Sequence, residues 1–311
     1  MTLPLHIIWN PSEGIDLGFF MIRFYSLMFV VAFGLGWFLM KKIFERENEP
    51  IDKLDSLFIW TALSTLIGAR LGHVIFYQTE LFTTDPLSIF LPFQTKPHFE
   101  FTGFSGLASH GAAIAIILSM VYFSKKIMKR PLLWVLDRVV IPVASGAIFV
   151  RLGNFFNSEI IGNTTTSPFG IRFVHDTFNK RQIIESTGIQ NPKEAYNAVV
   201  NNPKFAELLQ MVPAKHPTQL YEAFGYIFVF LFLFYAYWKT NAREKQGLLF
   251  GWFLILLWTV RFIVEFVKES QGGFFETDLG LFSTGQWLSI PFIVAGVIFV
   301  VLAKKRPQTV V

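Results

Sequence analysis

The stretch LLFGWFLILLWTVRFIVEFV, residues 248–267, decides the class of fold. It contains one arginine and one glutamate, and both lie near its C-terminal end. A helix needs about 20 predominantly apolar residues to cross the hydrocarbon core of a bilayer. The stretch is therefore expected to form a membrane-spanning helix.

The composition of the whole chain agrees with a membrane protein. Hydrophobic residues make up 52% of its 311 residues and charged residues 16%, whereas a soluble domain carries about 25% charged residues. A water-soluble chain could not hide that much apolar surface, so we expect the protein to lie in a bilayer. The formal net charge of +5 comes from lysines and arginines grouped in loops beside the apolar runs, so no nucleic-acid partner is expected.

Cysteine is absent from the chain. Disulfides, cysteine-ligated zinc and a thiol nucleophile of the protein's own are therefore excluded. Any thiol chemistry must use a thiol that belongs to the substrate.

The same length criterion, applied along the chain, predicts seven spans. The fourth contains Pro142, Ser145 and Gly146, and we expect it to be buried in the bundle or to line a cavity, where the freed backbone groups find partners. The predicted spans are Phe19–Ile43, Leu54–Tyr77, Gly106–Ser124, Trp134–Phe156, Gln219–Trp238, Leu248–Val267 and Gln286–Ala303.

Basic residues alternate between the two sides of the predicted bundle. The short loops on one side contribute mainly Lys96 and Lys268. By the positive-inside rule, the N-terminus is expected outside and the C-terminus in the cytoplasm. The opposite side carries Lys41, Lys42, Arg46, Lys53, Lys125, Lys126, Lys129, Arg130, Arg138, Lys239, Arg243, Lys245, Lys304, Lys305 and Arg306.

One loop is too long and polar to be a simple connector. Residues 157–218 are predicted to form a small periplasmic head between spans four and five, with one amphipathic helix over Pro192–Met211. The expected fold is thus an all-α membrane protein of seven transmembrane helices, N-out and C-in, with an inserted head. Its segments are residues 1–156 with spans one to four, 157–218 with the head, and 219–311 with spans five to seven.

Ionisable side chains inside spans are costly and are functional candidates by default. At 1.5 Å of rise per residue, every one of them falls in the outer half of the membrane, which predicts a chamber that opens to the outer leaflet. Arginines near the headgroup level suit a phosphate, and a histidine suits proton transfer near neutral pH. The candidates are Arg70, His110, Arg151, Glu222, Arg261 and Glu265, with Tyr25 and Asn154 as polar companions.

The same polar residues are also compatible with purely structural roles. Arg70 and Arg151 can snorkel to lipid headgroups without a further role, and Arg261 with Glu265, four residues apart, can form a structural ion pair. A secondary transporter or channel accounts for the composition as well as an enzyme does. So does a membrane protein that binds an anionic lipid without chemistry.

The segment RLGNFFNSEIIG, residues 151–162, resembles the signature of the prolipoprotein diacylglyceryl transferases. That signature has Arg, any residue, Gly or Ala, Asn-Phe, an apolar residue, Asn, any residue, Glu, two of any kind, then Gly. Further stretches resemble the family in the same order, and together they span nearly the whole chain. They are RFYSLM (23–28), GARLG (68–72), SHG (109–111), HPTQLYE (216–222) and VRFIVEF (260–266).

Three features depart from the family pattern. Val150 and Ala112 stand where the family usually has glycine, and the insertion is longer than usual around residues 180–214. The departures could reshape a cavity wall or a substrate entrance, but they remove no polar residue of the signature.

The resemblance implies an enzyme of the bacterial inner membrane whose active site faces the outer leaflet and periplasm. It would transfer the sn-1,2-diacylglyceryl group of phosphatidylglycerol to the lipobox cysteine of a prolipoprotein, forming a thioether and releasing sn-glycerol 1-phosphate. The expected partners are phosphatidylglycerol, the prolipoprotein signal peptide with its lipobox cysteine, and membrane lipids. No cofactor, metal or nucleic acid is expected.

The resemblance also implies residue roles. His110 is expected to act as base, and Arg151 and Arg261 to stabilise the phosphate that leaves. The residues expected to bind phosphatidylglycerol are Arg151, Tyr25, Asn154, Glu159, Gly162 and Arg70, and those expected to support them are Glu222, Glu265 and Asn157.

Overall fold

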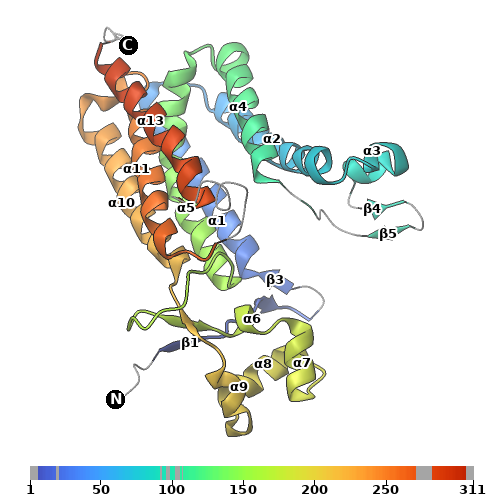
Figure 1. Cartoon of the computed structure of the whole chain (residues 1–311). Coiled ribbons are helices and arrows are strands. Elements are labelled where there is room, and N and C mark those ends of the chain that lie inside the picture. The colour runs from blue at the N-terminus through green and yellow to red at the C-terminus, as the bar shows by residue number, and fades with distance from the viewer. Residues whose placement is uncertain are drawn as a thin grey trace. The chain divides into compact units, whose positions relative to one another are not determined.

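The structure is a computed structural model that describes residues 6–18, 21–91, 93–95, 99–101, 106, 108–270 and 282–305. Lys96 and Arg306, which contribute to the predicted orientation, lie outside these ranges. The chain divides into two compact units, shown in Figure 1: Met1–Gly36 with Val140–Val311, and Trp37–Val139.

Within the described ranges, seven helices are long and apolar enough to cross a membrane, which confirms the predicted number. The chain is therefore an all-α membrane protein in its main architecture. The spans are Phe24–Glu47 (α1), Ile51–Tyr77 (α2), His110–Met128 (α4, Ser109–Tyr122, continued by the π-helical turn η2, Phe123–Met128), Leu132–Phe156 (α5), Thr218–Lys239 (α10), Leu248–Val267 (α11, Leu248–Val264, continued by the 3-10 turn η5, Glu265–Val267) and Thr284–Ala303 (within α13, Thr284–Lys305).

Two span boundaries differ from the prediction for local reasons. The first span begins at Phe24 rather than Phe19, because Met21–Arg23 form strand β3, which pairs with β2 (Gly14–Asp16). The third begins later and continues to Met128, where Lys129 adopts a positive φ of 56° and ends the helix.

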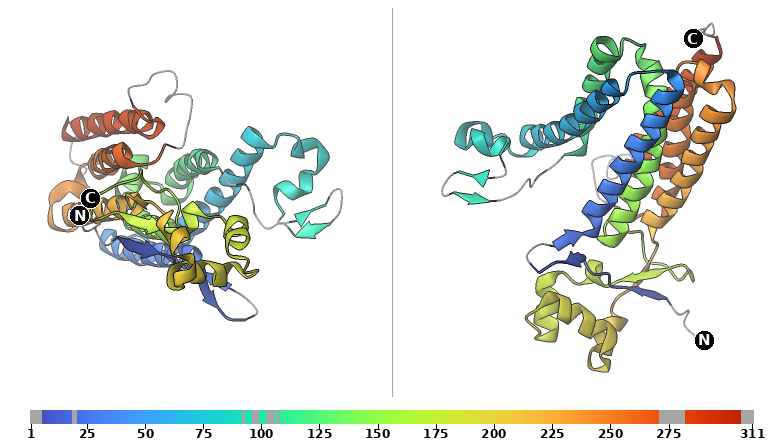
Figure 2. Two further views of the ribbon diagram at one scale, coloured as in Figure 1. Left: turned by 60° about the horizontal axis from the view of Figure 1, so that its bottom comes forward. Right: turned by 180° about the vertical axis from the view of Figure 1, so that it is seen from behind.

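In the first unit, α11 packs along both α10 and α13 (Figures 1 and 2). Trp258 of α11 stacks on Phe292 of α13 with ring centroids 4.2 Å apart. Half of the apolar window of α5 is buried, the largest share among the seven spans, as the Pro142 pattern predicted. Large apolar side chains such as Phe224 and Ile263 are exposed, as expected of helix faces that meet lipid.

The segment between α5 and α10, together with one strand from near the N-terminus, forms a small layer of sheet and short helices in the first unit. Its three-stranded sheet has the order β1–β6–β7, with β1 (Ile7–Trp9) parallel to β6 (Ile171–Phe173) and β7 (Ala214–Lys215) antiparallel to it. Trp9 joins this sheet to the end of α5, because its indole Nε1 donates to the carbonyl of Phe155 at 3.0 Å. The short helices are α6 (Val174–Thr177), α7 (Lys180–Thr187), α8 (Pro192–Asn201), η3 (Pro203–Phe205) and α9 (Ala206–Gln210).

The predicted single helix over Pro192–Met211 is wrong, because α8 ends at Asn201. Pro203 has no backbone N–H, so a helix cannot pass through it unbroken. Asn202 begins a new 3-10 turn instead, its side chain accepting from the N–H of Lys204. The helices still share one buried core, made of Val174, Phe178, Ile183, Ala195, Tyr196, Val199 and Val212.

In the second unit, α2 and α4 pack closely through glycines. A Cβ on Gly111 would overlap the carbonyl oxygen of Gly68 and lie 2.6 Å from Cα of Gly72, so only glycine lets the backbones approach this far. The chain between the two helices includes α3 (Leu81–Thr84), η1 (Pro86–Ile89), β4 (Phe93–Gln94) and β5 (Glu100–Phe101).

The second unit also contains a buried ion pair, formed between α5 and α1. Arg138 of α5 donates to Glu47 of α1 at 2.9 Å, and both side chains are at least 95% buried. The Arg138 guanidinium also lies 4.2 Å from the ring centroid of Trp134. Beside them, Glu49 pairs with Lys53 at 3.0 Å and with Arg130 at 2.8 Å.

Candidate active site

The last turns of α5 carry a chain of polar side chains. Nη1 of Arg151 donates to Oδ1 of Asn154 at 3.1 Å, a contact that their three-residue spacing on one helix allows, and Nδ2 of Asn154 donates to Oε2 of Glu159 at 3.4 Å. Asn157 donates to the other carboxylate oxygen of Glu159 at 3.2 Å. One hydrogen-bonded network therefore joins four polar residues of the segment 151–162, namely Arg151, Asn154, Asn157 and Glu159.

Arg151 also pairs with Glu222, which lies in the first turns of α10. The Glu222 side chain is 1% exposed and that of Arg151 13%, so the pair is largely shielded from solvent. One helical turn further along α10, Tyr226 is buried and its hydroxyl hydrogen-bonds Arg151. The charges of Arg151, Glu222 and Arg261 all act on that hydroxyl, so both arginines lie in the neighbourhood of Tyr226.

Arg261 lies on α11 with its guanidinium 5.3 Å from the ring centroid of Trp258. Its Nε is buried and has no hydrogen-bond partner among the described residues. The ion pair with Glu265 that the spacing allows is not formed in the described part of the chain, where Glu265 pairs with Lys268 at 3.2 Å. The backbone N–H of Glu265 still donates to the carbonyl of Arg261, so the helical spacing reaches this residue and its side chain turns to Lys268 instead.

Tyr25, near the start of α1, completes this group. Its hydroxyl hydrogen-bonds Asn154, and the charges of Glu159 and Arg151 act on it. Gly153 makes room for the aromatic ring, because a Cβ there would lie 3.0 Å from Cδ2 of Tyr25. A polar hydroxyl thus reaches the α5 network from a neighbouring span.

The chain turns sharply after α5, and the turn is held from α10. Ser158 and Ile160 both have positive φ, 54° and 58°, which is uncommon for serine and unfavourable for a β-branched residue. Nε2 of Gln219 donates to the carbonyl of Glu159 at 2.5 Å, and the Thr218 hydroxyl donates to the carbonyl of Ile160 at 2.6 Å. These bonds fix the direction in which Glu159 leaves the backbone.

Gly162 sits where three segments meet. Its N–H donates to the carbonyl of His216 at 2.9 Å, and it forms a bridge with Lys268. A Cβ at this position would overlap the carbonyl oxygen of Val267 and lie 2.8 Å from Cγ2 of Thr218. The glycine is therefore needed for close backbone approach.

Arg70 and His110 belong to the second unit. Arg70 donates from Nε to the carbonyl of Ile89 at 3.1 Å and from Nη2 to that of Ser88 at 2.9 Å. His110 is exposed, with Nε2 3.4 Å from the hydroxyl of Tyr77. Arg70 thus holds the chain around η1, and His110 presents an accessible ring.

The structure adds polar residues that the sequence did not single out as site residues, namely Tyr226, Gln219 and Lys268. Gln219, Glu222 and Tyr226 are spaced by three and four residues, so their spacing on one helix face was the available signal. In the described ranges, no group of three or more His, Cys, Asp and Glu side chains could hold a metal ion. Two arginines in the neighbourhood of one buried hydroxyl, one of them with an unmatched donor, can bind a phosphate.

The chain is similar to known proteins over nearly its whole length. A family model described as prolipoprotein diacylglyceryl transferase matches residues 13–302. Proteins named phosphatidylglycerol–prolipoprotein diacylglyceryl transferase match along their lengths: that of Tolumonas auensis is 33% identical, covering 96% of this chain and 98% of the relative. That of Chloroherpeton thalassium is 34% identical, covering 99% and 98%, and that of Porphyromonas gingivalis 35%, covering 99% of each. The chain belongs to the prolipoprotein diacylglyceryl transferase family.

Proposed function

We propose that this protein transfers the sn-1,2-diacylglyceryl group of phosphatidylglycerol to the thiol of the lipobox cysteine of a prolipoprotein. The observation that carries the proposal is the buried Nε of Arg261, which lacks a partner among the described residues. The shielded Arg151–Glu222 pair acts on the same Tyr226 hydroxyl as Arg261 does. A buried donor without a partner costs free energy, and an anionic ligand would satisfy it. The names of the relatives supply the two substrates.

In this reaction the cysteine sulfur forms a bond to the glyceryl carbon that carries the phosphate. The bond between that carbon and the phosphate oxygen breaks, its electron pair stays on the oxygen, and sn-glycerol 1-phosphate leaves. Negative charge on the phosphate increases as the bond breaks. Arg151 and Arg261 would stabilise that charge, and the shielding of the pair from solvent strengthens the effect.

The thiol proton must also be removed. A free thiol has a pKa of about 8.5, so only a few per cent is thiolate near neutral pH. His110 is the proposed base, because its exposed imidazole can take the proton and pass it to solvent. The Tyr77 hydroxyl, 3.4 Å from its Nε2, is placed to orient the ring.

The remaining candidates shape the lipid headgroup site. Tyr25, Asn154 and Glu159 would contact the headgroup as one hydrogen-bonded unit, and Gly162 would fix the backbone beside them. Glu222, Glu265 and Asn157 would hold the charged groups in place. Arg70, proposed as a further lipid contact, also anchors the chain around η1.

The proposed orientation is N-out and C-in, in the bacterial inner membrane. It is supported by Arg46 and Lys239 in the last turns of α1 and α10, each at the opposite end of its helix from Tyr25 or Glu222. In this orientation residues 157–218 form a periplasmic head, and the active site faces the outer leaflet and periplasm. The head separates spans one to four, in residues 1–156, from spans five to seven, in residues 219–311.

Transfer of labelled diacylglycerol by the purified protein, from phosphatidylglycerol to a lipobox peptide, tests the proposal. We expect a thioether product with the cysteine peptide and none with a Cys→Ser peptide. Arg151→Ala should abolish transfer, whereas Arg181→Ala, at an 87% exposed side chain on α7, should not. A folded wild-type protein that makes no product, or that instead moves a solute across vesicles, would contradict the enzyme assignment.

His110 has a separate test. His110→Gln should lower turnover in the same transfer assay, because the amide cannot accept the thiol proton. Full turnover in this variant would end its role as an obligatory base, because the arginines alone would then account for the thiolate.

A further inference from the structure

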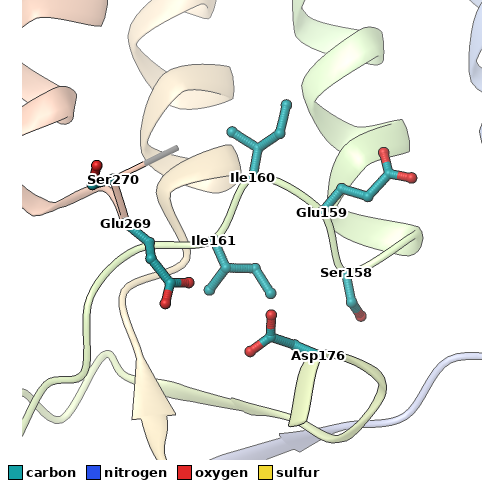
Figure 3. A pocket seen from close by; sticks show the side chains of 7 residues that line it. All are labelled: Ser158, Glu159, Ile160, Ile161, Asp176, Glu269 and Ser270. Carbon is teal, nitrogen blue, oxygen red and sulfur yellow. The ribbon is translucent and has the colours of Figure 1, made fainter. Parts of the chain in front are cut away.

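A pocket of about 410 Å³ lies against the turn that follows α5 (Figure 3). It is bounded by that turn, by α6 and by the residues after η5, all of them outside the membrane-spanning segments. Its lining residues are Ser158, Glu159, Ile160, Ile161, Asp176, Glu269 and Ser270.

The pocket is acidic. Glu159, Asp176 and Glu269 contribute three carboxylates, and Lys215 is the basic side chain paired with them, at 2.8 Å from Asp176 and 3.1 Å from Glu269. Burial lowers the pKa of Lys215, but hydrogen bonds to these two carboxylates outweigh burial and raise the pKa above its ordinary value. One ammonium held between two carboxylates leaves the pocket with a net negative charge.

Ser158 gives the pocket an unmatched polar group. The residue is 8% exposed, and its Oγ has no hydrogen-bond partner in the described part of the chain. Figure 3 shows its side chain on the pocket wall beside Asp176. A buried hydroxyl without a partner is costly, and it can both donate to and accept from a peptide group.

The pocket also shares a wall with the proposed catalytic site. Glu159 lines the pocket, and its carboxylate accepts from Asn154, which is bonded to Arg151. Ile160 and Ile161 add an apolar surface beside the carboxylates. A ligand in this pocket would therefore lie outside the membrane and next to the proposed phosphate site. It would contact hydrogen-bond acceptors and apolar side chains at the same time.

We propose that this pocket binds the polypeptide of the prolipoprotein immediately C-terminal to the acceptor cysteine. The proposal rests on the function proposed above. An extended polypeptide offers backbone N–H groups to the carboxylates and Ser158, and small side chains to the two isoleucines. Phosphatidylglycerol fits less well because its phosphate is repelled by the carboxylates, although its glycerol hydroxyls are a second source of donors.

Steady-state transfer with two families of lipobox peptides tests the proposal. One carries lysine and the other glutamate at the two positions after the cysteine. We expect the wild-type protein to show a KM for the lysine peptide about tenfold below that for the glutamate peptide. Glu269→Gln should shrink this ratio severalfold, because it removes one carboxylate while Lys215 keeps its bond to Asp176.

Ser158→Ala supplies a second, charge-free test. It should raise the KM for both peptides by about threefold to tenfold, with little change in kcat or in the KM for phosphatidylglycerol. Glu185→Gln, at an exposed carboxylate on α7, is the matched control and should change neither constant.

The outcomes distinguish a peptide site from a lipid site. A charge preference that is the same in wild type and Glu269→Gln, with an unchanged peptide KM in Ser158→Ala, would overturn the proposal. A change in the KM for phosphatidylglycerol alone would overturn it too, and would assign the pocket to the lipid headgroup. A wild-type protein that makes no thioether would instead contradict the proposed function itself.

Discussion

Gly162→Ala is the substitution whose effect follows most directly from the geometry. A Cβ at residue 162 would overlap the carbonyl oxygen of Val267 and would lie 2.7 Å from Cβ of His216 and 2.8 Å from Cγ2 of Thr218. None of these atoms is the free end of a flexible side chain. The backbone must therefore shift to accept the methyl group.

The size of the effect can be worked out in two steps. Forcing one extra methyl group into a packed site costs about 1–3 kcal/mol of stability. The backbone shift at residue 162 would also disturb the β-bridge to Lys268. It would then affect the turn after α5 that directs the Glu159 side chain. Because a displacement of about 1 Å can reduce turnover about 100-fold, we expect kcat to fall by about that factor while the protein stays folded.

The assay is diacylglyceryl transfer combined with thermal unfolding in detergent, with Gly170→Ala as the matched control. A Cβ at residue 170 would lie 2.8 Å from Cγ2 of Thr165, 3.1 Å from the carbonyl oxygen of Ser167 and 3.2 Å from Cβ of Ala214, so it is crowded as well, though less tightly. None of the atoms that crowd it belongs to the charged network. We expect a smaller loss of stability in the control and near-normal turnover. Normal turnover in Gly162→Ala, or an equal loss in both variants, would refute the reasoning.

Contacts elsewhere in the protein give three more predictions. Tyr226→Phe removes a hydrogen bond to Arg151 and should lower kcat about tenfold, since that factor corresponds to about 1.4 kcal/mol of activation free energy. An unchanged kcat would leave the tyrosine a packing role only. Burial has the largest effect on His175 and lowers its pKa in the folded state below the ordinary value of 6.5. As the pH falls below about 6.5, the imidazole is therefore protonated more readily in the unfolded state, and the stability of the fold decreases. Hydrogen exchange of the segment between α5 and α10 should show this loss as the pH falls from about 7.5 to about 5.5, and His175→Gln should flatten it. Arg138→Met should cost about 3–5 kcal/mol by removing the guanidinium that compensates the buried carboxylate of Glu47, whereas adding Glu47→Leu should recover most of that stability in thermal unfolding.

The number of spans could be predicted because each one depends on a local property. A run of about 20 apolar residues must satisfy its backbone internally, so composition alone identifies the helix. The start of the first span could not be placed, since Met21 pairs with Asp16 in a hairpin that apolarity does not reveal. The break in the predicted 192–211 helix could have been found, because Pro203 marks it in the sequence.

The active site was predictable in its residue types and only partly in its pairings. Arg151 and Asn154 share a helix face, and their hydrogen bond follows from the spacing. The pairing of Arg151 with Glu222 joins two helices far apart in the sequence, and no local pattern specifies it. Tyr226 was missed because an uncharged aromatic residue within an apolar run has no signal of its own until its neighbours on the helix face are considered.

The irregular spacing of the segment 151–162 has a physical cause in the structure. Its first part is helical and places Arg151 and Asn154 on one face, while Ser158 and Ile160 turn the backbone with positive φ so that Glu159 comes back to Asn154. Its last residue, Gly162, enters a bridge that a side chain would block. The segment therefore encodes a change of backbone direction as much as a set of functional groups. A one-residue insertion within it should consequently disrupt the site even when every polar residue is retained.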